Sequence, residues 1–580
     1  MDISTFGQFS TQGVLIKFSD LTILCDASLF TINQKPLPFV DYNIQEMENV
    51  EYIFISNFYQ MMALPLITEY THFTGKIYAT EPTVEFGRLL MNELVHEKEK
   101  YLIGKDFLRR NFNPIFNNPL YSEYDINSCI EKIQYVHYGE ILSLSEDTKV
   151  IASSSGYCLG GTNWSFLNSD KKVVYLSLSS FQHCHQCPLQ IEPLLNPDAL
   201  IISGGIAINN FDINESIKKI ISSIMFTLQN GGNVIIPALS CGIIFDILEY
   251  LSIYTKDIKN HSYHVISPIA KHSLHYSGIL SEWMNEKHKD RVYQQEEPMR
   301  CHEMLNNGQL HTHFSIQDFF KNKKSESSII FIDHPSLNMG DVIPLINLWK
   351  NDQKNTLIWI TPTDDLPEIL NNFQPLYLNV QYCPIDIRLN DKQFKDLVEK
   401  INPKEVLLPE SHFKPSRLSM TYPDDGLYLK YGQKSYHLYD KNRIKSAYIT
   451  EELAKKQFPK YHNETCLYYP YRGVLEFTNG KIYIKSLKAY EDSDLDVKYK
   501  EIDIQDLCQK ISNSGLGETL IEKNYDYTYI KLPVYHALLK FNNSSIQIET
   551  TNNKIRKKIY DIIKNIFDLT TDGNEKNNIN

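Results

Sequence analysis

Several features that would place a protein in a familiar class are missing from this sequence. No apolar run reaches the roughly 20 residues that a membrane-spanning helix requires, and the opening segment MDISTFGQFSTQ lacks the charged and apolar regions of a secretory signal. The ten cysteines are scattered, without the dense even spacing of a disulfide scaffold. We therefore expect a soluble intracellular protein whose cysteines are reduced thiols.

Positive charge and familiar catalytic motifs are also scarce. The chain has 58 Lys and Arg against 70 Asp and Glu, a net charge of -12, so the molecule as a whole has no electrostatic reason to bind nucleic acid. A local basic face stays compatible with this balance. No GxGxxG follows a strand, and GxxxxGK[ST], HExxH and GxSxG do not occur. The chemistry of the chain must therefore be sought elsewhere.

What the sequence does contain is typical of a folded protein of several domains. A length of 580 residues is too great for one hydrophobic core and predicts about three or four domains. The hydrophobic share of 42% and the aromatic share of 12% argue against extended disorder. Only the final segment, TTDGNEKNNIN, has the composition of a frayed tail.

Hydrophobic patterning predicts an α/β protein. GVLIKF and LTILCD read as a β-hairpin, and VEYIFIS reads as a strand that is followed by a loop and by a helix starting at Pro82. From about residue 173, short β-branched strands alternate with helices, one of which carries the apolar stripe Ile217, Ile220, Ile221, Ile224 and Leu228. After about 445 strands dominate, with Asn479-Gly480 as a hairpin turn, and a last small unit begins near 500.

Side chains that bind metals are present, but their pattern is ambiguous. Four of them lie within five residues in the segment HCHQC: His183, Cys184, His185 and Cys187. Zinc accepts such groups, but neighbours this close cannot easily point at one ion, so a polar loop is the alternative. Isolated histidines such as His72, His137, His334 and His412 are typical of hydrogen-bonded surface or core positions. The basic segments near 321 and 411 fit solvated faces as well as binding patches.

Taken in order, five segments resemble the metallo-β-lactamase/β-CASP family, which includes RNA 3′-end endonucleases of the cleavage and polyadenylation machinery and of Integrator. They are ISNFYQMMALPLITEYTHFTGKIYATEPTVEFGRLLM, SSGYCLGGTNW, NGGNVIIPALSCGIIFDILEYL, IDHPSLNMGDV and YCPIDIRLN, and the resemblance covers residues 13 to about 410. It implies an α/β fold: a metallo-β-lactamase αββα sandwich with an inserted β-CASP α/β domain, followed by a smaller α+β C-terminal dimerisation region.

The resemblance also implies where the domains begin and end. A metallo-β-lactamase-like domain takes residues 1–210 and returns at 386–445, on either side of the β-CASP domain at 211–385. A β-rich domain at 446–500 and an α/β heterodimerisation domain at 501–570 follow, and a disordered tail takes 571–580.

In active members of this family, a histidine- and aspartate-rich loop after the strand that matches VEYIFIS holds two zinc ions. Asp26 matches the first conserved acid of the family, which supports that loop and is not itself the principal ligand. The resemblance implies that the ligand positions themselves are degenerate: Asn57, Tyr59, Met61, Met62, Tyr157, Leu178, Ser203, Asp386 and Glu410. Zinc prefers imidazole, thiolate or carboxylate donors, so we expect no metal, no cofactor and no catalytic residue, and hence no hydrolysis by this mechanism.

The two methionines have a packing interpretation. A methionine side chain is flexible and fills irregular gaps. We therefore hypothesise that Met61 and Met62, with Leu178 opposite them, fill the volume that two ions and their waters would occupy.

The resemblance implies that the chain is a non-catalytic scaffold. It would pair with an active endonuclease of the same fold, mainly through its C-terminal regions, and with it join a helical-repeat subunit in a nuclear complex. That complex cleaves snRNA 3′ ends and nascent transcripts. An RNA-binding module and a residual metal-independent nuclease are the alternatives. Candidate partner-binding side chains lie on one face of the last helix, unless they merely cover their own sheet: Ile555, Ile559, Ile562, Ile563 and Ile566.

Overall fold

The computed structural model describes the chain unevenly along its length. It describes residues 2–5, 13–18, 21–29 and then 47–409, the last range with gaps at 104–119, 169–170, 204–205, 208–210, 257–260, 324–325 and 364–365. Beyond 409 it describes short strands between 428 and 549 and a few single positions. Residues 1–440 and 441–580 form two separate units. In the described part, no helix is both long and apolar enough to cross a bilayer.

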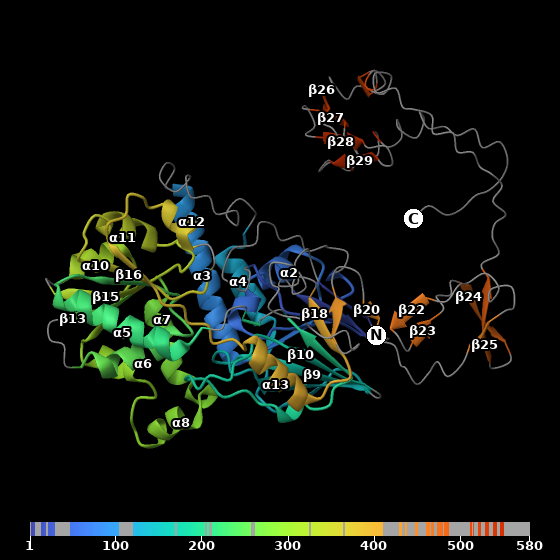
Figure 1. The fold of residues 1–580 in the computed structure, drawn as a ribbon, viewed down its shortest axis with the longest axis horizontal. Coiled ribbons are helices and arrows are strands. Elements are labelled where there is room, and N and C mark those ends of the chain that lie inside the picture. Colours follow the sequence, from blue (N-terminus) through green and yellow to red (C-terminus); the bar gives the residue numbers. More distant parts are fainter. Residues whose placement is uncertain are drawn as a thin grey trace. The chain divides into compact units, whose positions relative to one another are not determined.

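Two seven-stranded sheets form a sandwich in the first unit (Figure 1). The first sheet has the order β20-β1-β2-β3-β4-β5-β6, with β1 (Asp2–Thr5), β2 (Val14–Lys17), β3 (Thr22–Cys25), β4 (Tyr52–Phe54), β5 (Lys76–Ala79), β6 (Ile133–Tyr135) and β20 (Tyr436–His437). The second has the order β19-β18-β11-β10-β9-β8-β7, with β7 (Ile141–Ser143), β8 (Thr148–Ser154), β9 (Thr162–Asn168), β10 (Lys171–Leu176), β11 (Ala199–Ile202), β18 (Val406–Pro409) and β19 (Tyr428–Tyr431). The predicted hairpin is confirmed, because β2 and β3 pair antiparallel from Val14↔Cys25 to Lys17↔Thr22.

Side chains from both sheets meet in one core. Phe54 of β4 lies with its ring centroid 4.9 Å from that of Trp164 and 5.3 Å from that of Phe166, both of β9. Helices cover the outer faces, as an αββα sandwich requires. On the first sheet these are η1 (Phe58–Met61), α2 (Leu64–Tyr70), α3 (Glu81–Ile103) and α4 (Glu123–Glu131); the second sheet packs against α13 (Asp391–Ile401).

A six-stranded parallel sheet is inserted between β11 and β18 of the sandwich. Its order is β14-β13-β15-β12-β16-β17, with β12 (Val234–Pro237), β13 (His261–Ile266), β14 (Leu310–His313), β15 (Ser327–Ile332), β16 (Thr356–Trp359) and β17 (Asn379–Tyr382). Its helices are α5 (Ile213–Gln229), α6 (Ile244–Tyr254), α7 (Ala270–Ile279), α8 (Glu286–Tyr293), α9 (Arg300–Asn306), α10 (Ile316–Asn322), α11 (Val342–Trp349) and α12 (Leu366–Asn371), with the short turn η5 (Ser281–Trp283). The short turn η4 (Glu192–Leu194) lies between β10 and β11 of the sandwich. This confirms the predicted α/β insertion; the exact domain borders stay a prediction.

The second unit is described mainly through its strands, together with a few single positions. β24 (Gly473–Thr478) and β25 (Lys481–Ser486) pair antiparallel from Gly473↔Ser486 to Thr478↔Lys481, and β21 (Ala447–Ile449) joins them. The two residues of the predicted turn, Asn479 and Gly480, lie outside the described residues. β22 (Lys460–Asn463) pairs with β23 (Cys466–Tyr468). A four-stranded antiparallel sheet follows, from β26 (Leu520–Lys523), β27 (Thr528–Leu532), β28 (Ala537–Phe541) and β29 (Ile546–Glu549).

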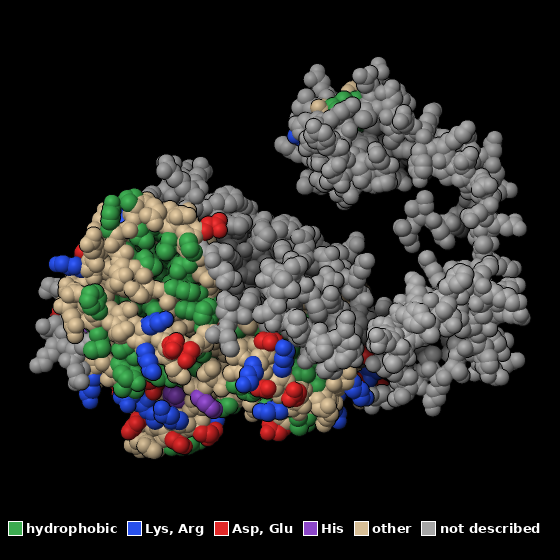
Figure 2. Space-filling view, viewed as in Figure 1, with side chains coloured by type: hydrophobic (Ala, Val, Ile, Leu, Met, Phe, Trp, Pro, Cys, Tyr) green, Lys and Arg blue, Asp and Glu red, His purple; other side chains and the backbone are tan. Residues whose placement is uncertain are grey.

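The surface of the described part carries charges of both signs. Figure 2 shows one face of the molecule, where Lys and Arg side chains are interspersed with Asp and Glu side chains rather than gathered into a continuous stripe. Phosphate-binding grooves depend on clustered positive charge. The coloured part of this face has no such groove.

Candidate functional site

The segment after β4 is stabilised by one of its own side chains. Asn57 is buried, and its Oδ1 accepts hydrogen bonds from the backbone N–H groups of Tyr59 (3.1 Å) and Gln60 (3.3 Å), which makes it the N-cap of η1. The first degenerate ligand position thus organises the turn, and the segment predicted as a loop is a short 3-10 helix.

Met61 and Met62 lie in the hydrophobic core and are at most 4% exposed. A Cβ atom added to Gly87 of α3 would lie 2.6 Å from Sδ of Met61, so the missing side chain at Gly87 makes room for the thioether. Leu178 is buried too, but it does not belong to the core cluster that holds the methionines. The suggestion that these three side chains fill one disused metal volume stays a hypothesis.

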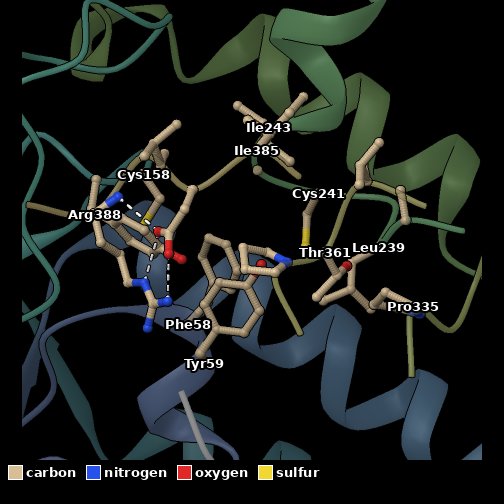
Figure 3. A pocket seen from close by; sticks show the side chains of 17 residues that line it. Phe58, Tyr59, Cys158, Leu239, Cys241, Ile243, Pro335, Thr361, Ile385 and Arg388 are labelled. Carbon is tan, nitrogen blue, oxygen red and sulfur yellow. Dashed lines mark hydrogen bonds and ion pairs between the residues drawn. The ribbon is translucent and has the colours of Figure 1, made fainter. Parts of the chain in front are cut away.

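Three degenerate positions meet at a single cavity of about 80 Å³ (Figure 3). Tyr59 follows β4, Tyr157 lies between β8 and β9, and Asp386 follows β17, so loops of the sandwich and the end of the insertion converge. The strand ends of the inserted sheet supply much of the remaining wall, which is mostly apolar and includes Leu239, Cys241, Ile243, Pro335 and Ile360. Phe58 and Cys158 also line it.

The carboxylate in this cavity is held by a neighbouring guanidinium. Nε of Arg388 donates to Oδ1 of Asp386 at 2.8 Å and Nη2 donates to Oδ2 at 2.6 Å, and the backbone N–H of Arg388 donates to Oδ1 at 3.1 Å. Both side chains are less than 10% exposed. Burial disfavours the charge of Arg388, but Asp386 outweighs this effect and places the pKa of Arg388 above its ordinary value. The lone pairs of Asp386 that a metal would need are therefore engaged.

The other polar groups in the cavity are neutral at physiological pH. Burial raises the pKa of Tyr59, Tyr157, Cys158 and Cys241 well above the ordinary values of phenols and thiols. A nucleophilic phenolate or thiolate would have to be ionised. The cavity consequently offers hydroxyl and thiol groups together with one neutralised ion pair.

The zinc ions of the family do not fit this set of donors. Zinc takes imidazole, thiolate or carboxylate ligands, and the described family positions supply an amide, phenols, thioethers, an aliphatic side chain and a hydroxyl, with one carboxylate already paired. Within the described ranges, no group of three or more His, Cys, Asp or Glu side chains is arranged to hold a metal ion. Ser203 is buried just after β11, and Glu410 lies outside the described residues.

Asp26 supports the loop, as the resemblance implies. Its Oδ1 accepts from the backbone N–H of Ser56 at 2.7 Å, and its Oδ2 accepts from the hydroxyl of Tyr175 at 2.7 Å. Burial outweighs these hydrogen bonds and raises the pKa of Asp26 to about 6. The side chain thus ties the ends of β3 and β4 to β10.

The HCHQC segment proves to be a loop with one anchored histidine. Nδ1 of the buried His185 lies 2.7 Å from Oδ2 of Asp246 on α6, whose Oδ1 accepts from the backbone N–H of His185 at 2.9 Å. His183 is exposed, and the group does not converge on a metal position. Sequence reasoning missed Asp246, which is 61 residues away in the chain.

Of the five isoleucines proposed as partner-binding, only Ile559 lies within the described residues. It is 0% exposed in the isolated chain, and a role of this helix face in partner binding stays a prediction. Ile555, Ile562, Ile563 and Ile566 lie outside the described residues.

Comparison with known proteins gives a consistent set of relatives. A metallo-beta-lactamase superfamily domain matches residues 15–199. Integrator complex subunit 9 of Gallus gallus is 35% identical over 408 residues, which cover 67% of this chain and 62% of that protein, so the match spans less than two thirds of the relative. The Integrator complex subunit 9 homolog of Nematostella vectensis is 30% identical over 558 residues, 89% of this chain and 84% of that protein. Endoribonuclease YSH1 of Yarrowia lipolytica is 24% identical over 359 residues, 59% and 40% respectively.

Proposed function

We propose that this chain, which belongs to the Integrator complex subunit 9 family, is a non-catalytic scaffold subunit of the Integrator complex. The observation that carries the proposal is the chemistry of the degenerate ligand positions. Tyr59 and Tyr157 present neutral phenols, and Asp386 is held in a two-pronged ion pair by Arg388. Hydrolysis in this family depends on a metal-activated water, and these groups would supply neither that water nor its electrophile.

The partner of such a subunit would be an active enzyme. We infer a heterodimer with Integrator subunit 11, the endonuclease subunit, formed mainly through the C-terminal region, and assembly of this pair on the Integrator subunit 4 scaffold. The antiparallel sheet β26–β29 gives the C-terminal region a framework on which an interface can be built. RNA would be contacted indirectly or through a shared groove, since the net charge of -12 disfavours binding by this chain alone.

The cellular role follows from that assembly. As a nuclear subunit that also passes through the cytoplasm during assembly, the chain would support snRNA 3′-end processing and the cleavage of nascent RNA polymerase II transcripts. Its contribution is to position and stabilise the nuclease rather than to cut RNA.

Metal content tests the division of labour. The full chain is purified alone and with its nuclease partner, and zinc is measured by mass spectrometry together with RNA cleavage. We expect zinc and chelator-sensitive cleavage only in the preparation that contains the partner. Stoichiometric zinc in the isolated chain, or cleavage by it, would contradict the proposal.

The interface is tested separately by truncation. Removal of residues 500–580 should abolish co-purification with the nuclease subunit and leave the first unit folded, as judged by circular dichroism. Undiminished co-purification would place the main interface elsewhere.

A further inference from the structure

A buried carboxyl on α3 faces the strand ends of the inserted sheet. Glu93 is 4% exposed, and its Oε1 accepts a hydrogen bond from the hydroxyl of Ser267, which follows β13. Asp333, which follows β15 and is 2% exposed, shares a hydrogen bond with the carboxyl of Glu93. Two acids from elements 240 residues apart therefore meet where the sandwich helix packs against the insertion.

Among the described residues, no positively charged side chain forms an ion pair with either of these two acids. The nearby Lys100 of α3 forms ion pairs with Glu97 (2.8 Å) and with Asp341 (3.4 Å). The other titratable groups that face the pair or line its cavity come from η1, from the loop after β12 and from the loop after β15: Tyr59, Cys241 and His334. Burial lowers the pKa of His334 to about 3, so it is neutral. Within the described part, Lys100 is thus paired with two other carboxylates and neutralises neither Glu93 nor Asp333 directly.

If both acids ionised, their two negative charges would lie in a small, mostly apolar site with little access to water. Glu93 and Asp333 line a cavity of only about 30 Å³ together with Met62, Leu90 and other apolar side chains. Oδ1 of Asp333 is buried and accepts no hydrogen bond from an N–H or hydroxyl group of the described residues. An uncompensated carboxylate at such a position is strongly unfavourable, and carboxyls in this situation retain a proton instead.

We propose that Glu93 and Asp333 form a proton-holding clasp that joins α3 to the inserted sheet while at least one carboxyl is protonated and loosens when both ionise. The clasp depends on the fold alone and not on the proposed scaffold function. Its ligand is the proton, because the described residues supply no third donor arranged for a metal ion.

The position of the transition follows from the environment of the pair. Burial raises the pKa of Glu93 to about 7 and that of Asp333 well above its ordinary range, with the neighbouring carboxylates adding to the shift of Asp333. The folded chain therefore keeps protons that the same carboxyl groups release in the unfolded chain near their ordinary pKa of about 4. The stabilisation is complete below about pH 4, decreases as the pH rises through about 7, where Glu93 loses its proton, and is lost completely only when Asp333 ionises at higher pH.

Neutral isosteres of the protonated acids test the clasp. In the purified full-length chain, the thermal unfolding midpoint is measured from about pH 5.5 to about pH 8.5 for wild type, Glu93→Gln and Asp333→Asn. The midpoint of the wild type should fall over this range, and Glu93→Gln should fall less, ending roughly 2–4 °C above wild type at the alkaline end. Glu51→Gln, at an exposed carboxylate, is the matched control and should follow the wild type.

Two further measurements make the test decisive. Amide exchange in α3 and in residues 333–342 should accelerate with pH in the wild type beyond the intrinsic rate, and Asp333→Asn should suppress this change even where Glu93→Gln does not fold. Equal pH slopes in wild type and in whichever of the two variants folds would overturn the proposal. A midpoint that calcium or zinc ions raise in the wild type but not in the variants would overturn it too, since the acids would then hold a cation.

Discussion

Two cavities share Tyr59 in their walls, and they bury charge in different ways. In the larger cavity, the acid Asp386 and the base Arg388 lie two residues apart and neutralise each other through two short hydrogen bonds. In the smaller cavity, Glu93 and Asp333 come from distant elements, and none of the described residues that line its wall is a Lys or an Arg. The first charge is cancelled by a counterion, and the second must be cancelled by protons.

This difference predicts which of the two cavities changes its protonation state with pH. An Arg–carboxylate pair stays ionised over the whole physiological range, because guanidinium does not lose its proton there. Two carboxyls that share a proton change state near neutrality when one has a pKa of about 7. The larger cavity should therefore be indifferent to pH, whereas the smaller one should respond to it.

Without Arg388 the difference between the cavities should disappear, because the larger cavity would then also contain a buried acid that no positive charge neutralises. Arg388→Ala leaves the carboxylate of Asp386 buried without its partner, so the free energy of unfolding should fall by about 3–5 kcal/mol. Urea denaturation of the full chain measures this loss. Because the orphaned acid can then take up a proton, the variant should also become less stable as the pH rises.

Two variants calibrate that result. Lys404→Ala removes the exposed partner of Asp198, a 2.6 Å pair whose lysine is 75% exposed, and should cost no more than about 1 kcal/mol. Asp386→Asn in the Arg388→Ala background should recover part of the loss, since no charge stays buried. If Arg388→Ala is no more destabilising than Lys404→Ala, the pair does not bury charge in the way described.

A histidine cluster on the inserted sheet should give a pH dependence of stability opposite to that of the two acids. Nδ1 of the buried His264 lies 2.9 Å from Nε2 of His313, and the ring centroid of His264 lies 5.4 Å from that of His311. Burial, and then the charges of these neighbours, lowers the pKa of His264 to about 3. The unfolded chain takes up a proton near pH 6.5, so stability should fall with acidification by about 1.4 kcal/mol per pH unit below that value.

The variant His264→Gln should flatten this acid slope. Its control is His72→Gln at an exposed position. Denaturation between about pH 5 and about pH 7 gives both slopes. An unchanged slope in His264→Gln would show that another group carries the acid sensitivity, and the acid cluster and the histidine cluster would no longer form an opposed pair.

Much of the fold was accessible from the sequence, because hydrophobic period and turn chemistry are local. The hairpin β2–β3 and the hairpin β24–β25 were predictable from two apolar runs joined by a short turn, and buried strands such as β12 and β15 from β-branched runs. The stripe on α5 was predicted from its spacing: Ile220, Ile224 and Leu228 are buried, whereas Ile217 and Ile221 at its edge are only half-buried.

The site was accessible only in part. The resemblance identified Tyr59, Tyr157 and Asp386 as matching positions, and they do meet at one cavity. The spacing Asp-x-Arg was a readable signal for the ion pair, because alternate residues of an extended segment lie on one side. The meeting of Glu93 with Asp333 carried no local signal, since sequence alone does not tell which distant loop covers a helix face.

The smallest effect on stability is expected from the packing between η1 and α3, which lies beside the two cavities and involves no charged group. Gly87→Ala should stabilise α3 by about 1 kcal/mol through its higher helix propensity. A steric clash should offset this gain, because Sδ of Met61 would lie 2.6 Å from the new Cβ. In a Met61→Ala background that conflict disappears, so Gly87→Ala should stabilise there by about 1 kcal/mol, as urea denaturation of the wild type, the two single variants and the double variant would measure. Met62→Ala is the matched control background, because the three closest contacts of the added Cβ all belong to Met61. Equal effects of Gly87→Ala in the two alanine backgrounds would mean that Met61 does not fill the space that Gly87 leaves, and the methionine would lose its packing role.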